Sequence, residues 1–229
     1  MKKLFLGLSI LLNILLFALC VYQMSRPKVR TQQADNSYAT YLSLQRNMPV
    51  NNGDIVFMGG KQVSDCAWHE LLGNCRIKNR GVPGARINNE YARLSSILEN
   101  TPFQLFLLFG IDDLHAGQQP DLVLEQYINF VLFVREKSPM TEIIIHSVLP
   151  VNSRLPNARM NVKASDIEEF NTKLKEFALS NGIVFLNLYN DFCDESGTIL
   201  SPFYSVGDGF LLSGAGYEMW AERVRSFVR

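Results

Sequence analysis

An α/β fold built on a central parallel sheet is predicted by two features of this chain. From residue 54 onward, short apolar segments alternate with longer segments in which apolar residues recur every three or four positions. The short segments are apolar throughout, as strands are when helices cover both faces of a sheet. Strands and helices that alternate in this way wind into a sheet with right-handed crossovers and a helix layer on each side.

Five strands are expected, each a short run bounded by polar or turn-forming residues. They cover residues 55–58, 76–78, 104–109, 142–147 and 183–187. A length of 229 residues suits one such domain with an extension, and a hydrophobic content of 47% is ample for its core. We therefore assign residues 54–229 to a single domain.

Four longer helices are expected between and after these strands. Residues 87–99 and 122–137 each carry one apolar stripe, as a helix on the face of a sheet does. A third helix should open at the Ser-Asp-Ile-Glu capping box of residues 165–168 and stop at the Asn-Gly pair of residues 181–182. The last helix should start near Ser213 and bury a stripe that includes tryptophan.

The N-terminal region differs in composition from this domain. Two lysines precede an apolar run from Leu4 to Tyr22, which as a helix would span the roughly 30 Å hydrocarbon core of a membrane. Residues 1–23 are therefore predicted to be a membrane anchor, and the alternative is a signal peptide cut after Cys20. With the two lysines held inside, the domain of this single-pass cytoplasmic-membrane protein would be extracytoplasmic.

Residues 24–53 are predicted to link this segment to the domain. They are polar, and residues 31–37 are expected to be an irregular tether. Residues 38–46 are expected to form a short helix against the domain. An extracytoplasmic domain would hold its cysteines in an oxidising compartment, where Cys66 and Cys75 flank a short helical stretch. A disulfide between them requires that helix to end near Gly73, and the alternative is free buried thiols.

The composition also excludes two classes of partner. The 22 basic residues are balanced by 22 acidic ones, whereas a nucleic-acid-binding surface needs clustered positive charge. The three histidines and four cysteines show no spacing typical of a metal site. Neither nucleic acid nor a metal nor another cofactor is therefore expected.

Several chemically distinctive segments are expected to meet at one edge of the sheet. Residues 59–61, 110–112 and 146–147 follow or end predicted strands, and the loop that holds Asp208 precedes the last helix. Ligands of doubly wound sheets bind at the carboxyl ends of the strands, near the point where strand order reverses. The topology alone therefore predicts a pocket at this edge.

The same segments resemble the sequence blocks of a known enzyme family. In order and spacing, residues 54–61, 79–84, 110–114 and 208–217 resemble the blocks of the SGNH (GDSL-type) esterase/lipase family. The resemblance extends over residues 54–228 and implies a flavodoxin-like three-layer α/β/α sandwich with a central parallel sheet of about five strands. Members of that family cleave esters through a serine that a histidine and an aspartate activate, and they have an oxyanion hole.

The reactive groups of that family are replaced in this chain. The resemblance places Lys61 at the serine and Gly60 at the aspartate before it. Leu211 stands at the histidine and Asp112 at the oxyanion asparagine. The family's oxyanion glycine and triad aspartate are retained, as Gly84 and Asp208. These replacements remove the nucleophile, the base and one oxyanion donor together, so conventional serine-esterase activity is not expected.

Two functions follow as hypotheses. The favoured one is a non-catalytic, membrane-anchored domain that binds an envelope glycan, an acylated glycan or a protein partner. The alternative is a rewired esterase or acyltransferase acting on acetyl or other acyl esters. Side chains that could serve such a rewired site, each with a structural alternative such as helix capping or burial, are Ser64, Ser147, His115, His146 and Lys61.

The candidate ligand pocket includes charged residues and glycines. It comprises Gly60, Lys61, Gly84, Arg86, Asp112, His146 and Asp208. Because Lys61 and Asp112 occupy positions that approach one substrate carbonyl in the family, we expect them to form an ion pair across the former oxyanion site. Asp208 has two expected roles, as part of the pocket or as the cap of a turn.

Overall fold

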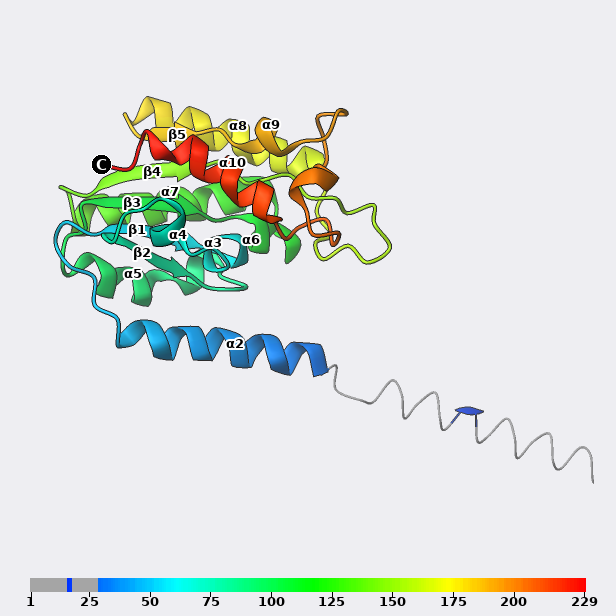
Figure 1. The fold of residues 1–229 in the computed structure, drawn as a ribbon, viewed down its shortest axis with the longest axis horizontal. Helices are drawn as coiled ribbons and strands as arrows, with labels where there is room; N and C mark the ends of the chain where they lie inside the picture. The colour runs from blue at the N-terminus through cyan, green and yellow to red at the C-terminus, as the bar shows by residue number, and fades with distance from the viewer. Residues whose placement is uncertain (1–15, 18–28) are drawn as a thin grey trace, which may run out of the picture. The chain divides into compact units, whose positions relative to one another are not determined.

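The computed structural model of the chain describes residues 16–17 and 29–229 (Figure 1). Its centre is a parallel sheet of five strands in the order β2-β1-β3-β4-β5. The strands are β1 (Ile55–Gly59), β2 (Ile77–Gly81), β3 (Gln104–Leu108), β4 (Glu142–His146) and β5 (Val184–Leu186). All four pairings are parallel, which confirms the predicted sheet.

Helices connect the strands and close the two faces of the sheet (Figure 1). In the domain they are α3 (Lys61–Ser64), α4 (Trp68–Leu71), η1 (Ile87–Asn89), α5 (Tyr91–Leu98), α6 (Ile111–His115), α7 (Pro120–Lys137), α8 (Ala164–Ser180), α9 (Tyr189–Phe192), η2 (Pro202–Tyr204) and α10 (Gly214–Arg225). The expected helices over residues 122–137 and from Ser213 are confirmed as α7 and α10, and Ser213 caps α10 by accepting a hydrogen bond from the Gly216 N–H.

Two hydrophobic cores separate the layers, because alternate residues of each strand point to opposite faces. Val56 and Leu105 pack with α5, α7 and α8 in one core. Phe57 and Phe106 pack with α4, α9 and α10 in the other, which holds both tryptophans, Trp68 and Trp220. The chain therefore forms the predicted three-layer α/β/α sandwich.

Two helix boundaries differ from the prediction. The stretch predicted as one helix over residues 87–99 is divided into η1 and α5, because the Glu90 N–H bonds three residues back, to the Ile87 carbonyl. The expected capping box at Ser165 is not formed. The N-cap of helix α8 is Lys163, two residues earlier, and the Ser165 hydroxyl donates to the adjacent Asp166 carboxylate instead. Asn181 and Gly182 end α8 as predicted.

The helix before the domain is longer than predicted. Helix α2 covers Val29–Arg46, so residues 31–37 are helical where an irregular tether was expected. The chain divides into two compact units, Met1–Ser37 and Tyr38–Arg229, and the second contains the whole sheet. Within residues 16–17 and 29–229, no helix is both long enough and apolar enough to cross a membrane. Apart from Leu16 and Phe17, the predicted anchor Leu4–Tyr22 lies outside the described residues.

The cysteines of the domain are free thiols. Cys66 is buried and Cys75 is exposed on the far side of the short helix α4, so the disulfide alternative is not formed. Burial raises the pKa of the Cys66 thiol to about 12, which makes it a poor nucleophile at neutral pH.

Candidate functional site: a degenerate hydrolase centre

The carboxyl ends of β1 and β3 bring two of the predicted site segments together. Gly60 is the N-cap of α3 after β1, and Gly110 is the N-cap of α6 after β3. These strands are neighbours at the point where strand order reverses, which is where such folds bind ligands. A Cβ placed on Gly60 would lie 2.7 Å from the Asp112 carboxylate. The Asp112 carboxyl therefore fills the space that a side chain at position 60 would need.

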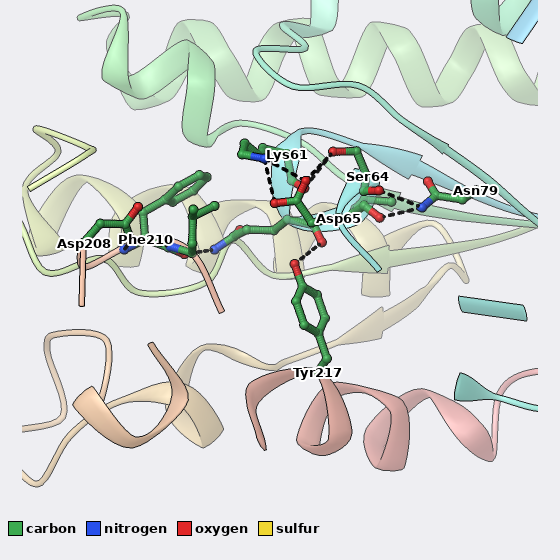
Figure 2. A network of polar contacts seen from close by, with 10 residues as sticks. Lys61, Ser64, Asp65, Asn79, Asp208, Phe210 and Tyr217 are labelled. Carbon is green, nitrogen blue, oxygen red and sulfur yellow. Dashed lines mark hydrogen bonds and ion pairs between the residues drawn. The ribbon is translucent and has the colours of Figure 1, made fainter. Parts of the chain in front are cut away.

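Lys61 does not pair with Asp112, and this prediction is wrong. The Lys61 ammonium instead donates to both oxygens of Asp65, each 2.7 Å away (Figure 2). The two residues are four positions apart, so the turn of α3 places them on the same side. Both side chains are about one quarter exposed, which spares the ammonium the cost of full dehydration beside Asp112.

Ser64 supports this ion pair, and no histidine or free amine among the described residues is hydrogen-bonded to its hydroxyl. Its hydroxyl donates to the Lys61 carbonyl at 2.9 Å and lies 3.2 Å from a carboxylate oxygen of Asp65. Ser64 is the last residue of α3, so the expected N-cap role is also wrong. Figure 2 shows the Lys61 and Ser64 side chains both directed toward Asp65.

The loop after β1 is fixed by side chains from distant elements. The Asn79 amide donates to the carbonyls of Val63, Ser64 and Cys66. The Tyr217 hydroxyl, from α10, donates to the Gln62 carbonyl at 3.0 Å (Figure 2). This loop is therefore held rigidly around the position of the family's nucleophile.

Among the carboxyl groups at this edge of the sheet, Asp112 has the largest shift in pKa. Burial and the neighbouring Asp113 charge raise the pKa of its carboxyl, while Arg86 and Arg159 oppose the shift, and the resulting pKa is about 7. Asp112 forms no ion pair within the described part of the chain. The raised pKa favours the protonated carboxyl, and in that form it can donate a hydrogen bond, as an asparagine would.

Asp113 lies behind Asp112 and is fully buried. One of its oxygens accepts a hydrogen bond from the Ile87 N–H at 3.4 Å, and the other has no hydrogen-bond partner among the residues that the structure describes. Burial raises the pKa of this carboxyl to about 6. The two adjacent acids thus share an environment that favours their neutral forms.

Gly84 and Arg86 border the same region from the loop after β2. Gly84 is exposed. Its φ angle is 77°, a backbone conformation that glycine adopts most readily. Arg86 is exposed, and its charge acts on Asp112. The sequence did not single out Arg159, whose backbone N–H donates to the Asp208 carbonyl and whose charge also acts on Asp112. No local motif marked this residue, because its position depends on a loop between distant elements.

Asp208 caps a turn, which is the second of its two expected roles. One carboxylate oxygen accepts hydrogen bonds from the N–H groups of Phe210 and Leu211, at 3.0 and 2.7 Å. Leu211, at the histidine position, packs against the core of α5, α7 and α8. The aspartate therefore orients a backbone turn here, with no imidazole to orient.

The residues considered for a rewired site are scattered. His146 was predicted to line the pocket but is 1% exposed and lies among the rings of Phe57, Phe106 and Trp220. The buried Ser147 hydroxyl accepts the N–H groups of Leu188 and Tyr189.

The other two histidines are equally remote from any nucleophile. His115 accepts from the Asn161 N–H, and His69 lies beside Glu70. Among the described residues, no histidine is hydrogen-bonded to a hydroxyl or thiol, so the pairing that activates a serine or cysteine is absent.

A strand-helix turn at the reversal point, a glycine loop after β2 and an aspartate turn before the last helix together define an SGNH-type hydrolase fold. The family model of the GDSL-like lipase/acylhydrolase family matches residues 58–219, more than half of the chain. The chain therefore belongs to the GDSL-like lipase/acylhydrolase family.

Solved structures agree on the fold. A protein from Streptococcus pneumonia named for platelet activating factor is 23% identical with a TM-score of 0.75, over 88% of this chain and 97% of that one. A GDSL-like lipase from Bacteroides thetaiotaomicron is 20% identical with a TM-score of 0.69, over 83% and 96%. An acetyl-xylooligosaccharide esterase from Geobacillus is 17% identical with a TM-score of 0.60, over 79% and 96%. A comparison with curated proteins finds no match.

Proposed function

We propose that this protein is a non-catalytic member of its family, a membrane-tethered domain that binds an acylated glycan of the cell envelope. The absence of catalysis is proposed because of the residue that stands at the family's nucleophile position. Lys61 stands there with its ammonium bound to Asp65, and Leu211 stands where the base would be. A site without a nucleophile and a base cannot form and release an acyl-enzyme.

A rewired esterase is not favoured by the geometry. The Ser64 hydroxyl is occupied by its own helix and Asp65, and the Ser147 hydroxyl lies inside the domain. A lysine nucleophile needs a free amine, whereas Lys61 is held by a carboxylate at 2.7 Å. None of the three therefore has the base and the access to substrate that acyl transfer requires.

The proposal of a glycan ligand rests on the residues at the edge of the sheet where the family has its active site. Some of the solved structures with this fold are described as an acetyl-xylooligosaccharide esterase and an acetyl xylan esterase. In this chain the same edge has an exposed arginine, Arg86, and a carboxyl at Asp112 that is able to donate or accept. Val206, which pairs with the Leu211 carbonyl, adds an exposed apolar surface. Such a mixture suits a sugar that carries an acyl group.

The full chain should bind an acetylated oligosaccharide without releasing acetate. Saturation-transfer NMR with acetylated xylo-oligosaccharide follows both, because bound acetyl methyls receive saturation and free acetate has its own signal. We expect saturation transfer that Arg86→Glu weakens several-fold and that the matched surface variant Arg154→Glu leaves unchanged. Acetate release above that of a heat-denatured sample would contradict the non-catalytic assignment. Absence of saturation transfer would contradict the ligand class alone.

The tether is the remaining part of the proposal. It is motivated by the apolar run Leu4–Tyr22 and the lack of a good cleavage site after it. We expect the mature protein to stay in the membrane fraction after carbonate washing and to begin at residue 1 or 2. A mature N-terminus near Val21, read by N-terminal sequencing of the membrane fraction, would show that the segment is removed.

A further inference from the structure

A second hollow lies away from the degenerate centre, between the C-terminal part of α2 and α5. It has a volume of about 410 Å³, within the range of small-molecule sites. Its apolar lining includes Leu42, Met48, Val50 and Ile97, and Arg80 from β2 also lines it. We call it the α2–α5 groove. All of its residues belong to the unit Tyr38–Arg229.

A polar network forms part of the lining of the α2–α5 groove. The Tyr38 hydroxyl donates to Glu90 at 3.1 Å, and Glu90 forms an ion pair with Arg93. Arg93 also donates to the Gln45 side chain at 2.7 Å, and Gln45 donates to the Gly81 carbonyl. These bonds hold the part of α2 from Tyr38 onward against β2 and α5, so the hollow is a fixed feature of this unit.

Arg80 is a buried cation without an acidic partner. It is 5% exposed, and its guanidinium donates only to backbone carbonyls, those of Asn79 and Met48 at 2.9 and 2.7 Å and that of Pro49 at 3.4 Å. Among the described residues, no carboxylate lies within ion-pair distance of it. Its Nε–H donates to no protein acceptor in that part of the chain.

The other charges of the groove do not compensate Arg80. Burial lowers the pKa of Arg80, and so does the charge of Arg93, which is itself paired with Glu90. The charge of Asp54 opposes this shift, but Asp54 forms its ion pair with Lys78. At the rim, Arg46 and Glu99 are both exposed and opposite in sign. One desolvated positive charge therefore remains beside an apolar lining, and a buried charge is costly unless an opposite charge meets it.

We propose that the α2–α5 groove binds a small amphiphile with a single carboxylate head and an alkyl tail. The carboxylate accepts from the Nε–H of Arg80, which donates to no protein acceptor in the described part of the chain, and its negative charge meets that of the guanidinium. The tail lies along Leu42, Val50 and Ile97. A dianionic phosphate head fits less well, because Glu99 at the rim would repel the second charge.

The proposal is tested on the full chain in nonionic detergent micelles with dodecanoate that carries a photoreactive diazirine near its methyl end. After irradiation, peptide mass spectrometry locates the adducts. We expect them at Leu42, Met48 or Ile97, competed by plain dodecanoate and several-fold less by dodecanol or dodecyl phosphate. Arg80→Gln should reduce the labelling about tenfold, whereas Arg154→Gln should not change it.

A second variant separates ligand contact from loop position, because Arg80 also holds the carbonyls of residues 48 and 49. Ala92→Trp fills the groove from α5 and leaves Arg80 in place, so it should abolish labelling there. The matched variant Ser180→Trp, on the exposed end of α8, should label as the natural chain does. Adducts outside the groove, equal competition by dodecanol, or unchanged labelling of Ala92→Trp would each overturn the proposal.

Discussion

Replacing Glu90 with alanine is expected to lower the free energy of unfolding by about 3–5 kcal/mol, because it leaves a charged partner buried and unpaired. Glu90 is fully buried, and the Arg93 side chain that pairs with it is 10% exposed. The same carboxylate accepts the hydroxyl of Tyr38, whose pKa is raised to about 12 by burial and by the Glu90 charge. Removing it therefore also removes one of the contacts between the C-terminal part of α2 and the domain.

Chemical denaturation followed by tryptophan fluorescence measures this loss, since Trp68 and Trp220 are both buried in the domain. Glu99→Ala is the matched control, because Glu99 is exposed and directly follows α5, and it should change stability by less than about 0.5 kcal/mol. The double replacement Glu90→Leu with Arg93→Met should cost less than the sum of the two single changes. Additive losses, or a loss below about 1 kcal/mol for Glu90→Ala, would show that the ion pair does not anchor α2.

Replacing His146 with phenylalanine is expected to stabilise the domain, and increasingly so as the pH falls. Both imidazole nitrogens are buried among the rings of Phe57, Phe106 and Trp220, and neither has a hydrogen-bond partner in the described part of the chain. Burial lowers the pKa of His146 to about 3. An apolar ring of similar size removes two unsatisfied polar atoms and keeps the packing.

The direction of the pH effect follows from where the proton binds. The unfolded chain takes up a proton at His146 below about pH 6.5, whereas the folded domain takes it up only near pH 3. The unfolded state therefore binds more protons between these values, so folded stability falls as the pH falls through this window. The difference between His146→Phe and the natural chain should grow by about 1.4 kcal/mol for each pH unit below 6.5.

The comparison between variants is needed because two carboxyls act in the opposite direction. The pKa values of Asp112 and Asp113 are raised by burial to about 7 and about 6, so these acids bind protons more readily in the folded domain and favour it on acidification. Their contribution cancels when His146→Phe is subtracted from the natural chain at each pH. A pH-independent difference for His146→Phe would show that the imidazole is protonated in the folded state.

The fold was largely predictable because its signals are local. Five apolar runs marked the five strands, and the helices α7 and α10 began and ended close to their predicted residues. The failures were also local. Helix α8 has its N-cap at Lys163 and forms no capping box at Ser165, and the residues expected to be a tether are part of helix α2. Polar residues 31–37 are compatible with both helix and coil, so composition alone could not distinguish them.

The candidate site was predictable in its position but not in its contacts. Strand order placed Gly60 and Asp112 at one edge, and the structure brings them together there. The partner of Lys61 was missed although Asp65 lies four residues further on, a spacing that favours an ion pair on a helix. The resemblance to the family predicted Asp112, across the sheet, as the partner, whereas the turn of the short helix α3 places Asp65 beside Lys61.

By itself, the sequence determined the layered α/β domain and its family, because periodicity and motif order are properties of the chain order. It also determined that Lys61 and Leu211 replace the family's serine and histidine. The tertiary structure alone decided which charged groups are buried. Arg80 and Glu90 are buried because residues far apart in sequence, on α2, β2 and α5, meet around them, whereas the ion pair of Glu90 with Arg93 follows from a spacing of three residues. Desolvation depends on that enclosure, and so do the acidities of Asp112 and His146.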